Sequence, residues 1–278
     1  AVLASLGVLA FASAFPLGYD SATLTEKGVI LRQVIYGYTA ATAAVGVMVW
    51  FTLRGIPAET ETKHDSGWAT ALTQFRGVIK LKVVWLQATV LVCAYSSYKA
   101  FDQYALFAVR GHGIDEIDAA QIVTAGAWTR PVAALALGLL GDRFGISRMA
   151  LVCFVLLIIS HSLFAFTGQA LGSLSMILLN TLVTGVAIFG LRGLYFGLLE
   201  EGQIPLAVTG TAVGLVSVIG YTPDVYVAAI AGYLIDQNPG LLGFQHLFVL
   251  LLAFSIVGAL AALAFTREAT PSSVTSAH

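Results

Sequence analysis

Long apolar runs alternate with short polar segments along this chain of 278 residues. A helix that crosses the hydrocarbon core of a membrane needs about 20 mainly apolar residues, because each residue adds about 1.5 Å to its length. Runs close to this length or longer recur throughout the sequence, and each predicts a membrane-spanning helix: 1–18, 33–53, 83–108, 119–140, 149–168, 173–199, 208–235 and 245–266. The pattern therefore predicts an all-α, polytopic membrane protein with eight spans.

The longest polar segment, residues 54–82, separates the first two predicted helices from the other six. Within it, apolar residues recur at helical spacing with basic residues nearby: Trp68, Leu72, Phe75 and Ile79, with Arg76, Lys80 and Lys82. This pattern favours an amphipathic helix that lies on an anionic membrane surface. We therefore expect four regions: two helices over 1–53, a linker over 54–82, a six-helix unit over 83–266 and a polar tail over 267–278.

Composition supports a membrane location and excludes several function classes. Hydrophobic residues make up 58% of the chain and charged residues 10%, whereas soluble domains carry about 25% charged residues. The net charge of −1 argues against a nucleic-acid partner. The five histidines show no metal-ligand spacing, and we find no nucleotide-binding, metalloprotease or hydrolase motif. We expect no cofactor, no metal and no enzymatic activity, and the expected partners are the lipid bilayer and a small-molecule substrate.

A short charged turn between the fourth and fifth apolar runs has the pattern G-x-x-x-D-R-x-G-x-x-R, formed by Gly138, Asp142, Arg143, Gly145 and Arg148. It resembles the signature loop of major facilitator superfamily transporters. In that family the acidic and basic residues pair with neighbouring helix ends and close the cytoplasmic gate, so the resemblance implies a gate role for these five residues. Ile146 and Ser147 stand where the family usually has basic residues.

The family plan has two six-helix halves joined by a cytoplasmic linker. On that plan residues 1–53 hold the last two helices of the first half, and residues 83–266 hold the whole second half. About four helices of the complete fold are then absent. The resemblance therefore implies an N-terminally truncated member whose partners include the missing N-terminal helices of the same protein. We expect such a chain not to transport by itself.

Three further segments resemble a bacterial branch of this superfamily that is related to organic-anion, sugar-acid and organophosphate carriers: 191–201, 209–214 and 217–224. The resemblance implies alternating access about a central site, driven by a proton or by exchange of anions. It does not identify the ligand.

The lysines and arginines indicate how the chain is oriented. If the signature loop is cytoplasmic, that side holds Arg54, Lys63, Arg76, Lys80, Lys82, Arg143, Arg148 and Arg267, whereas the opposite side holds Lys27, Arg32 and Arg110. Cytoplasmic loops carry the excess of basic residues. We therefore expect a multi-pass protein of the bacterial inner (plasma) membrane with a cytoplasmic C-terminus.

Ionisable residues inside predicted spans are candidates for a binding site, because charge is costly in hydrocarbon. Tyr95, Lys99 and Asp102 are spaced i, i+4, i+7 and share one helical face, and Tyr98 lies beside them. Lys99 and Asp102 can pair with each other. The alternative is a structural ion pair solvated near the outer mouth of the protein.

Two arginines also fall within spans. Arg130 lies near the middle of its helix beside Pro131, and its guanidinium suits a carboxylate, phosphate or sulfonate. The alternative for Arg130 is an internal salt bridge with Asp224. Arg192 lies about seven residues from the cytoplasmic end of its predicted helix, where it can line a site or reach the interface.

Asp224 follows Pro223 and Gly220, and this spacing predicts a broken or kinked helix that can line a cavity. Its carboxylate could carry a proton or pair with Arg130 or Lys99. It could also simply end a structural kink. At another helix end, Glu200 could pair with the start of the following helix.

These residues lead to one hypothesis, secondary active transport of a small organic anion. Arg130 would hold the anionic group, Lys99 would add positive potential, and Tyr95, Tyr98 and Arg192 would line the site. Asp102 or Asp224 would take the coupling proton. The alternatives are an exporter of cationic or lipophilic compounds, which would bind to the two aspartates, and a transporter-like protein that senses a ligand without moving it.

Overall fold

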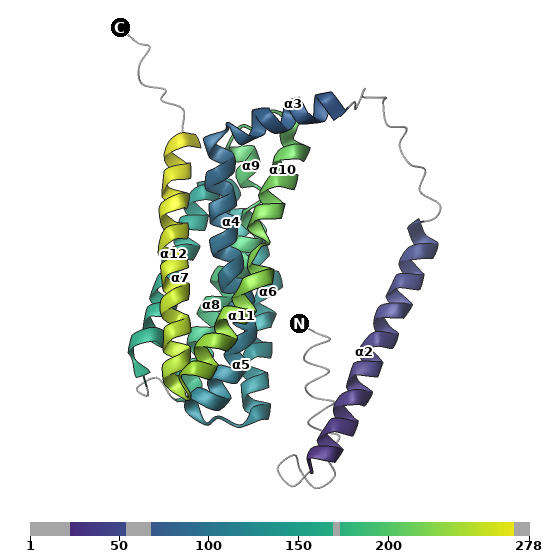
Figure 1. Ribbon diagram of the computed structural model, residues 1–278, viewed down its shortest axis with the longest axis vertical. Coiled ribbons are helices and arrows are strands. Elements are labelled where there is room, and N and C mark those ends of the chain that lie inside the picture. Colours follow the sequence, from purple (N-terminus) through teal and green to yellow (C-terminus); the bar gives the residue numbers. More distant parts are fainter. Residues whose placement is uncertain (1–22, 54–67, 169–172, 270–278) are drawn as a thin grey trace. The chain divides into compact units, whose positions relative to one another are not determined.

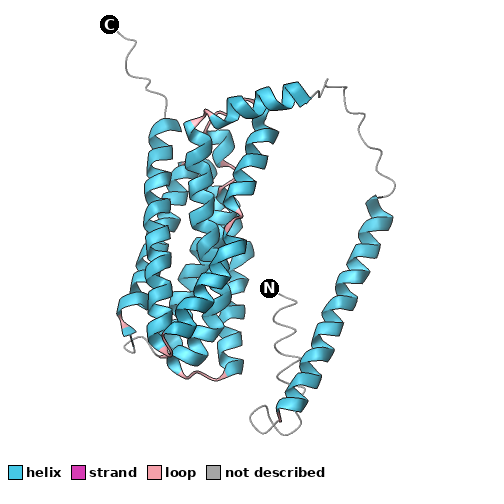
Figure 2. Ribbon diagram, in the orientation of Figure 1, coloured by secondary structure: helices cyan, strands magenta, loops and turns pink. Residues whose placement is uncertain are grey.

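The computed structural model describes residues 23–53, 68–168 and 173–269, and the regular elements in these ranges are all helices (Figure 2). The predicted all-α class is therefore confirmed. Among the described residues, six candidate spans are long and apolar enough to cross a membrane, and one of them, Leu206–Gln237, consists of two consecutive helices. The stretch Lys82–Gly111, taken together with the end of the short helix before it, is a further, bent candidate. The predicted run 1–18 lies outside the described residues.

Helix α2 (Leu24–Leu53) belongs to a unit of its own. It corresponds to the run predicted over 33–53 but begins earlier, because a capping box starts it. The Thr23 amide donates to Glu26 Oε2 at 2.8 Å, and the Glu26 amide donates back to Thr23 Oγ1 at 3.3 Å. These reciprocal bonds satisfy two amide groups that would otherwise lack partners at the helix start.

The second unit is a bundle of helices shown in Figure 1. Helix α4 (Lys82–Ala100) is continued by η1 (Phe101–Gln103), α5 (Tyr104–Leu106) and the π-helical turn η2 (Phe107–Gly111). There follow α6 (Glu116–Phe144), α7 (Ile146–Phe166), α8 (Leu174–Leu194), α9 (Leu198–Glu201), α10 (Leu206–Gly220), α11 (Pro223–Gln237) and α12 (Leu241–Ala269). The runs predicted from residue 83 onward each match one of these helices or a consecutive group of them.

Two of these predicted runs are interrupted. The run over 208–235 divides into α10 and α11 at Tyr221 and Thr222, as the Gly220 and Pro223 spacing predicted. The run over 173–199 was predicted as one helix, which is wrong at its end. Helix α8 stops at Leu194, and a turn separates it from α9.

Helix α3 (Trp68–Ile79) runs across one end of the bundle (Figure 1). Its segment Leu72–Ile79 meets Lys82–Gly111 at 78°. Val78 is fully buried, whereas Leu72 and Phe75 are exposed. The indole of Trp85 donates to the Ile79 carbonyl at 2.8 Å and so holds the corner between the two helices. A location of α3 on the membrane surface remains a prediction.

An aromatic core holds the end of the bundle farthest from α3. Phe107 of η2 packs against Phe164 of α7 and Phe248 of α12, with ring centroids 4.8 and 5.0 Å apart. Tyr104 contacts the same two rings at 5.8 and 5.5 Å. Such tilted and edge-to-face pairs add stabilisation beyond the apolar area they bury, so this core fixes how α4 and its continuation pack against α7 and α12.

Candidate functional site

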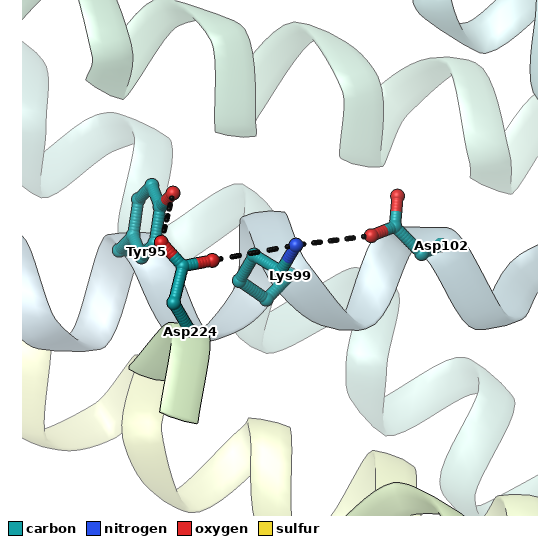
Figure 3. A network of polar contacts seen from close by, with 4 residues as sticks. All are labelled: Tyr95, Lys99, Asp102 and Asp224. Atoms are coloured by element: carbon teal, nitrogen blue, oxygen red, sulfur yellow. Dashed lines mark hydrogen bonds and ion pairs between the residues drawn. The ribbon is translucent and has the colours of Figure 1, made fainter. Parts of the chain in front are cut away.

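Lys99 on α4 joins two carboxylates from different elements. Its Nζ lies 3.4 Å from Asp102 Oδ2 in η1 and 3.4 Å from Asp224 Oδ1 in α11 (Figure 3). The ion pair expected between Lys99 and Asp102 is therefore present. The Lys99 side chain is 26% exposed, so its charge is partly removed from solvent. The pair to Asp224 ties α4 to the start of α11.

Asp224 lies where the backbone restarts as a helix. Pro223 occupies the first position of α11, where its missing N–H leaves no bond unmade. The Asp224 carboxylate follows in the first turn, a favourable place for negative charge. Tyr95 Oη donates to Asp224 Oδ2 at 2.9 Å (Figure 3). Of the two partners considered for Asp224, the structure shows Lys99 and not Arg130.

The two arginines lie over aromatic rings. Arg130, in the middle of α6, has its Cζ 4.6 Å from the centroid of the Phe189 ring on α8. Arg192, in the last turn of α8, has its Cζ 4.4 Å from the centroid of the Tyr98 ring on α4. The Tyr98 and Phe189 rings meet edge to face at 6.3 Å. One pair of touching rings therefore supports both guanidinium groups.

These contacts connect residues of α4, η1, α6, α8, α11 and the turn before α11 into one network. We call this network the polar cluster, and its members are Tyr95, Tyr98, Lys99, Asp102, Arg130, Phe189, Arg192, Tyr221 and Asp224. Tyr221 joins it through an edge-to-face contact with Tyr95 at 4.8 Å. Asp102, Arg130, Arg192 and Asp224 are exposed, whereas Tyr95 and Phe189 are buried beneath them. In the polar cluster, buried aromatic rings thus lie beneath charged side chains that are exposed on the surface of the bundle.

The chemistry of the polar cluster suits an anion. Within the described ranges no carboxylate forms an ion pair with Arg130 or Arg192. A guanidinium stacked on a ring keeps its N–H edge available for two parallel hydrogen bonds to a carboxylate, phosphate or sulfonate. The salt bridge considered for Arg130 is therefore not observed in this part of the chain. No group of metal-ligating side chains is found among the described residues.

The signature loop lies in the turn between α6 and α7. Gly145 has φ +98°, a conformation that favours glycine, and the turn therefore depends on this residue. Asp142, Arg143 and Arg148 are exposed, Gly138 lies within α6, and Arg143 Cζ is 5.5 Å from the Phe144 ring.

A carboxylate of α9 accepts hydrogen bonds from this turn. Glu201 of α9 accepts from the Ser147 amide at 2.7 Å and from Ser147 Oγ at 2.6 Å, and so caps α7. Ser147, which departs from the family pattern, is thus the residue through which the loop is anchored. The sequence pointed to Glu200 at the following helix, whereas the capping carboxylate is that of Glu201, and it caps α7.

Two members of the polar cluster were not singled out from the sequence. Phe189 and Tyr221 lie in apolar surroundings typical of membrane helices, so no local pattern separates them from packing residues. Phe189 precedes Arg192 by three positions, yet Arg192 stacks on Tyr98 of another helix. Only the packing of α4, α6 and α8 brings these rings and guanidinium groups together.

Comparison with known proteins finds similarity to two curated membrane proteins. No family model matches the sequence. Inner membrane protein YihN of Escherichia coli K12 is 25% identical over 245 residues, which cover 84% of this chain and 56% of that protein. Inner membrane protein YqcE of the same organism is 22% identical over 258 residues, which cover 89% of this chain and 59% of that protein. The chain therefore spans little more than half the length of these two relatives.

Among solved structures, a bacterial homologue of the human lysosomal transporter Spinster, inward-facing and unoccupied, matches with a TM-score of 0.58 and 18% identity. The match covers 96% of this chain and 65% of that one. The chain thus shares the fold of that transporter structure. The two curated relatives are both inner membrane proteins.

Proposed function

We propose that the chain is part of a secondary active transporter that moves a small organic anion across the bacterial inner membrane by alternating access. The observation that carries this proposal is the pair of exposed guanidinium groups of Arg130 and Arg192 on the touching rings of Phe189 and Tyr98. Charged groups at this depth are costly in hydrocarbon, so they are expected to face a wet cavity or a charged ligand. The remaining helices of the same transporter would cover this open face and complete the cavity.

In this mechanism Arg130 and Arg192 bind the anionic group, and Tyr95 and Tyr98 line the site. The hydroxyl of Tyr95 is occupied by Asp224, so this ring contributes mainly its edge and face. The N–H edges of the guanidinium groups would orient the bound anion, while the aromatic rings beneath them limit the conformations of the two arginine side chains. The ligand is therefore an anion with a carboxylate, phosphate or sulfonate group, consistent with the organic-anion and organophosphate branch.

Proton coupling at Asp102 or Asp224 is part of the same proposal, and the charge balance around Lys99 supports it. With Asp102 and Asp224 both ionised, the three residues carry a net charge of −1, which repels an anion. A proton on either carboxylate leaves the group neutral and allows the positive potential of Lys99 to act on the ligand. Anion and proton would then bind cooperatively, as a symporter requires. Asp142, Arg143 and Arg148 would form the cytoplasmic gate beside the α7 cap.

The first experiment tests the anion site. A thermal-stabilisation screen of sugar phosphates, sulfonates and carboxylates finds a ligand, and binding is then compared for wild type, Arg130→Lys and Arg130→Ala. Arg130→Ala should weaken anion binding strongly. Arg130→Lys should weaken it less, because lysine keeps the positive charge but cannot donate two parallel hydrogen bonds from a planar group. Arg110→Ala, a change in an exposed arginine outside the polar cluster, is the control. Wild-type affinity in both Arg130 variants would exclude Arg130 as a ligand.

The second experiment tests coupling in proteoliposomes of the whole transporter. Asp102→Asn and Asp224→Asn are compared for uptake driven by a pH gradient and for exchange without one. The variant of the coupling carboxylate should lose stimulation by the gradient and keep exchange. Gradient-driven uptake unchanged in both variants would contradict proton coupling at these two residues.

The same assays separate the alternatives. An exporter of cationic compounds would use the two aspartates, and lipophilic cations would then compete for the site while anions would not. Both carboxylates are already held by Lys99, which disfavours this reading. A sensor would bind the anion without accumulation in proteoliposomes.

A further inference from the structure

A crevice of about 420 Å³ lies between α4, α10 and α12, away from the polar cluster. Its lining is almost entirely apolar and includes Trp85, Ala88, Cys93, Ile219, Phe254 and Val257. None of its lining residues belongs to the polar cluster. The crevice is therefore a feature separate from the proposed anion site.

The lining residues place the crevice along the half of α4 that is nearest to α3. It extends from Trp85, in the first turn of α4, to Cys93, eight positions further along the helix. At about 1.5 Å per residue this distance is roughly 12 Å. Trp85 and Val257 are partly exposed, so the crevice opens on the surface of the bundle. An apolar crevice that extends over this length of α4 can hold part of a lipid acyl chain.

Basic residues lie close to Trp85 in the chain, at one end of the crevice. The Trp85 indole is bonded to the Ile79 carbonyl, which is next to Lys80 in the chain, and Lys82 lies one turn before Trp85. Arg76 is exposed on α3. Glu268 offsets part of this charge through its 3.7 Å contact with Lys82. Lys80 and Lys82 therefore bring positive charge next to Trp85 in the chain, and the contact with Glu268 offsets only that of Lys82.

We propose that the crevice binds an anionic phospholipid, with one acyl chain along Trp85 to Cys93 and the phosphate group near Lys80 and Lys82. Tryptophan at this level is typical of the boundary between headgroups and acyl chains. Basic residues at the membrane surface each favour anionic lipid by about fivefold. Helix α3, which turns by 78° from α4, carries its exposed Leu72 and Phe75 at the same level and fits beside the headgroup in the interface.

The test uses Trp85 as the reporter. In the full chain, Trp50, Trp68 and Trp128 are replaced by phenylalanine, and the protein is placed in phosphatidylcholine bilayers that contain a rising fraction of dibrominated phosphatidylglycerol. Bromine quenches indole fluorescence at short range, so the titration reports lipid at the crevice. Dibrominated phosphatidylcholine in phosphatidylglycerol is the reverse titration. We expect phosphatidylglycerol to bind at least fivefold more tightly than phosphatidylcholine.

Two kinds of variant test the two parts of the site. Ala253→Phe fills the crevice from an exposed position of α12 and should abolish the preference, whereas Ala228→Phe, at an exposed position of α11 outside the crevice, should preserve it. Lys80→Gln should lower the preference about fivefold, and Arg110→Gln should leave it unchanged. If Ala253→Phe fails to fold, the lysine variant still decides the outcome. Equal quenching by both lipids in the wild type, or a preference that survives Lys80→Gln in full, would overturn the proposal.

Discussion

Arg192 of α8 lies over the ring of Tyr98 on α4, with its Cζ 4.4 Å from the ring centroid. The same ring contacts Phe189, which supports Arg130 from α6. Two positive groups on different helices are therefore positioned by one aromatic pair. A shift of α4 against α8 would therefore alter the contacts of Tyr98 with both Arg192 and Phe189.

Removal of the Tyr98 ring should weaken anion binding. A cation–π contact contributes about 0.5–2 kcal/mol, so Tyr98→Leu should raise the Kd of the anion roughly 2- to 30-fold. Tyr98→Phe retains the ring and should stay close to wild type. Titration calorimetry with the anion found by screening measures both values. An equal loss in both variants would assign the effect to the hydroxyl rather than to the ring.

Removal of Lys99 should destabilise the bundle. Lys99→Met leaves two carboxylates without their cation, and the half-exposed setting limits the loss to about 0.5–2 kcal/mol. The double variant Lys99→Met/Asp224→Asn should recover part of this loss, because one uncompensated charge is gone. Thermal unfolding in detergent measures the four stabilities of this cycle. Strict additivity would show that Lys99 and Asp224 do not interact in the folded protein.

Gly220 should tolerate no side chain. A Cβ at this position would lie 2.2 Å from Leu91 Cδ2, so Gly220→Ala should force α10 away from α4 and lower stability by about 1–3 kcal/mol. Gly214→Ala, with nothing within 4 Å of the added carbon, is the matched control and should be neutral or slightly stabilising. Leu91→Ala should rescue the Gly220 variant in part. Similar unfolding temperatures for the two alanine variants would contradict the close packing at Gly220.

The Glu201 cap should stabilise the start of α7. Glu201→Ala removes two hydrogen bonds to Ser147 and should lower stability by about 1–2 kcal/mol. Glu200→Ala, a change in the exposed neighbour, should have little effect. Thermal unfolding distinguishes the two variants, and hydrogen exchange at the first amides of α7 should increase only for Glu201→Ala. Unchanged exchange there would show that the cap does not hold the loop.

The sequence predicted the helices well because their signal is local. Apolar runs of sufficient length and the Gly220 and Pro223 break are visible without knowledge of packing. Lys99 and Asp102 are three positions apart on one turn, so their pairing could also be read from spacing. The beginning of α2 was missed because its capping box at Thr23 lies before the apolar run.

Contacts between distant segments could not be predicted in this way. Tyr95 and Asp224 are separated by 129 positions, and nothing in either segment indicates the other. The choice of Glu201 over Glu200 depends on which carboxylate the turn after α8 directs toward α7. The sequence offered Asp224 as an acidic partner for Arg130. In the structure Asp224 pairs with Lys99, and Arg130 lies over the ring of Phe189.

Lys99 has one acidic partner on the continuation of its own helix and another on α11. If α11 moves away from α4 during a transport cycle, the ammonium group of Lys99 stays paired with Asp102, so its charge always has a counter-charge nearby. Such a movement then breaks only the contacts that Asp224 makes with Lys99 and with Tyr95. A lysine with two acidic partners would thus allow the start of α11 to move relative to α4 without leaving its ammonium group unpaired in either position.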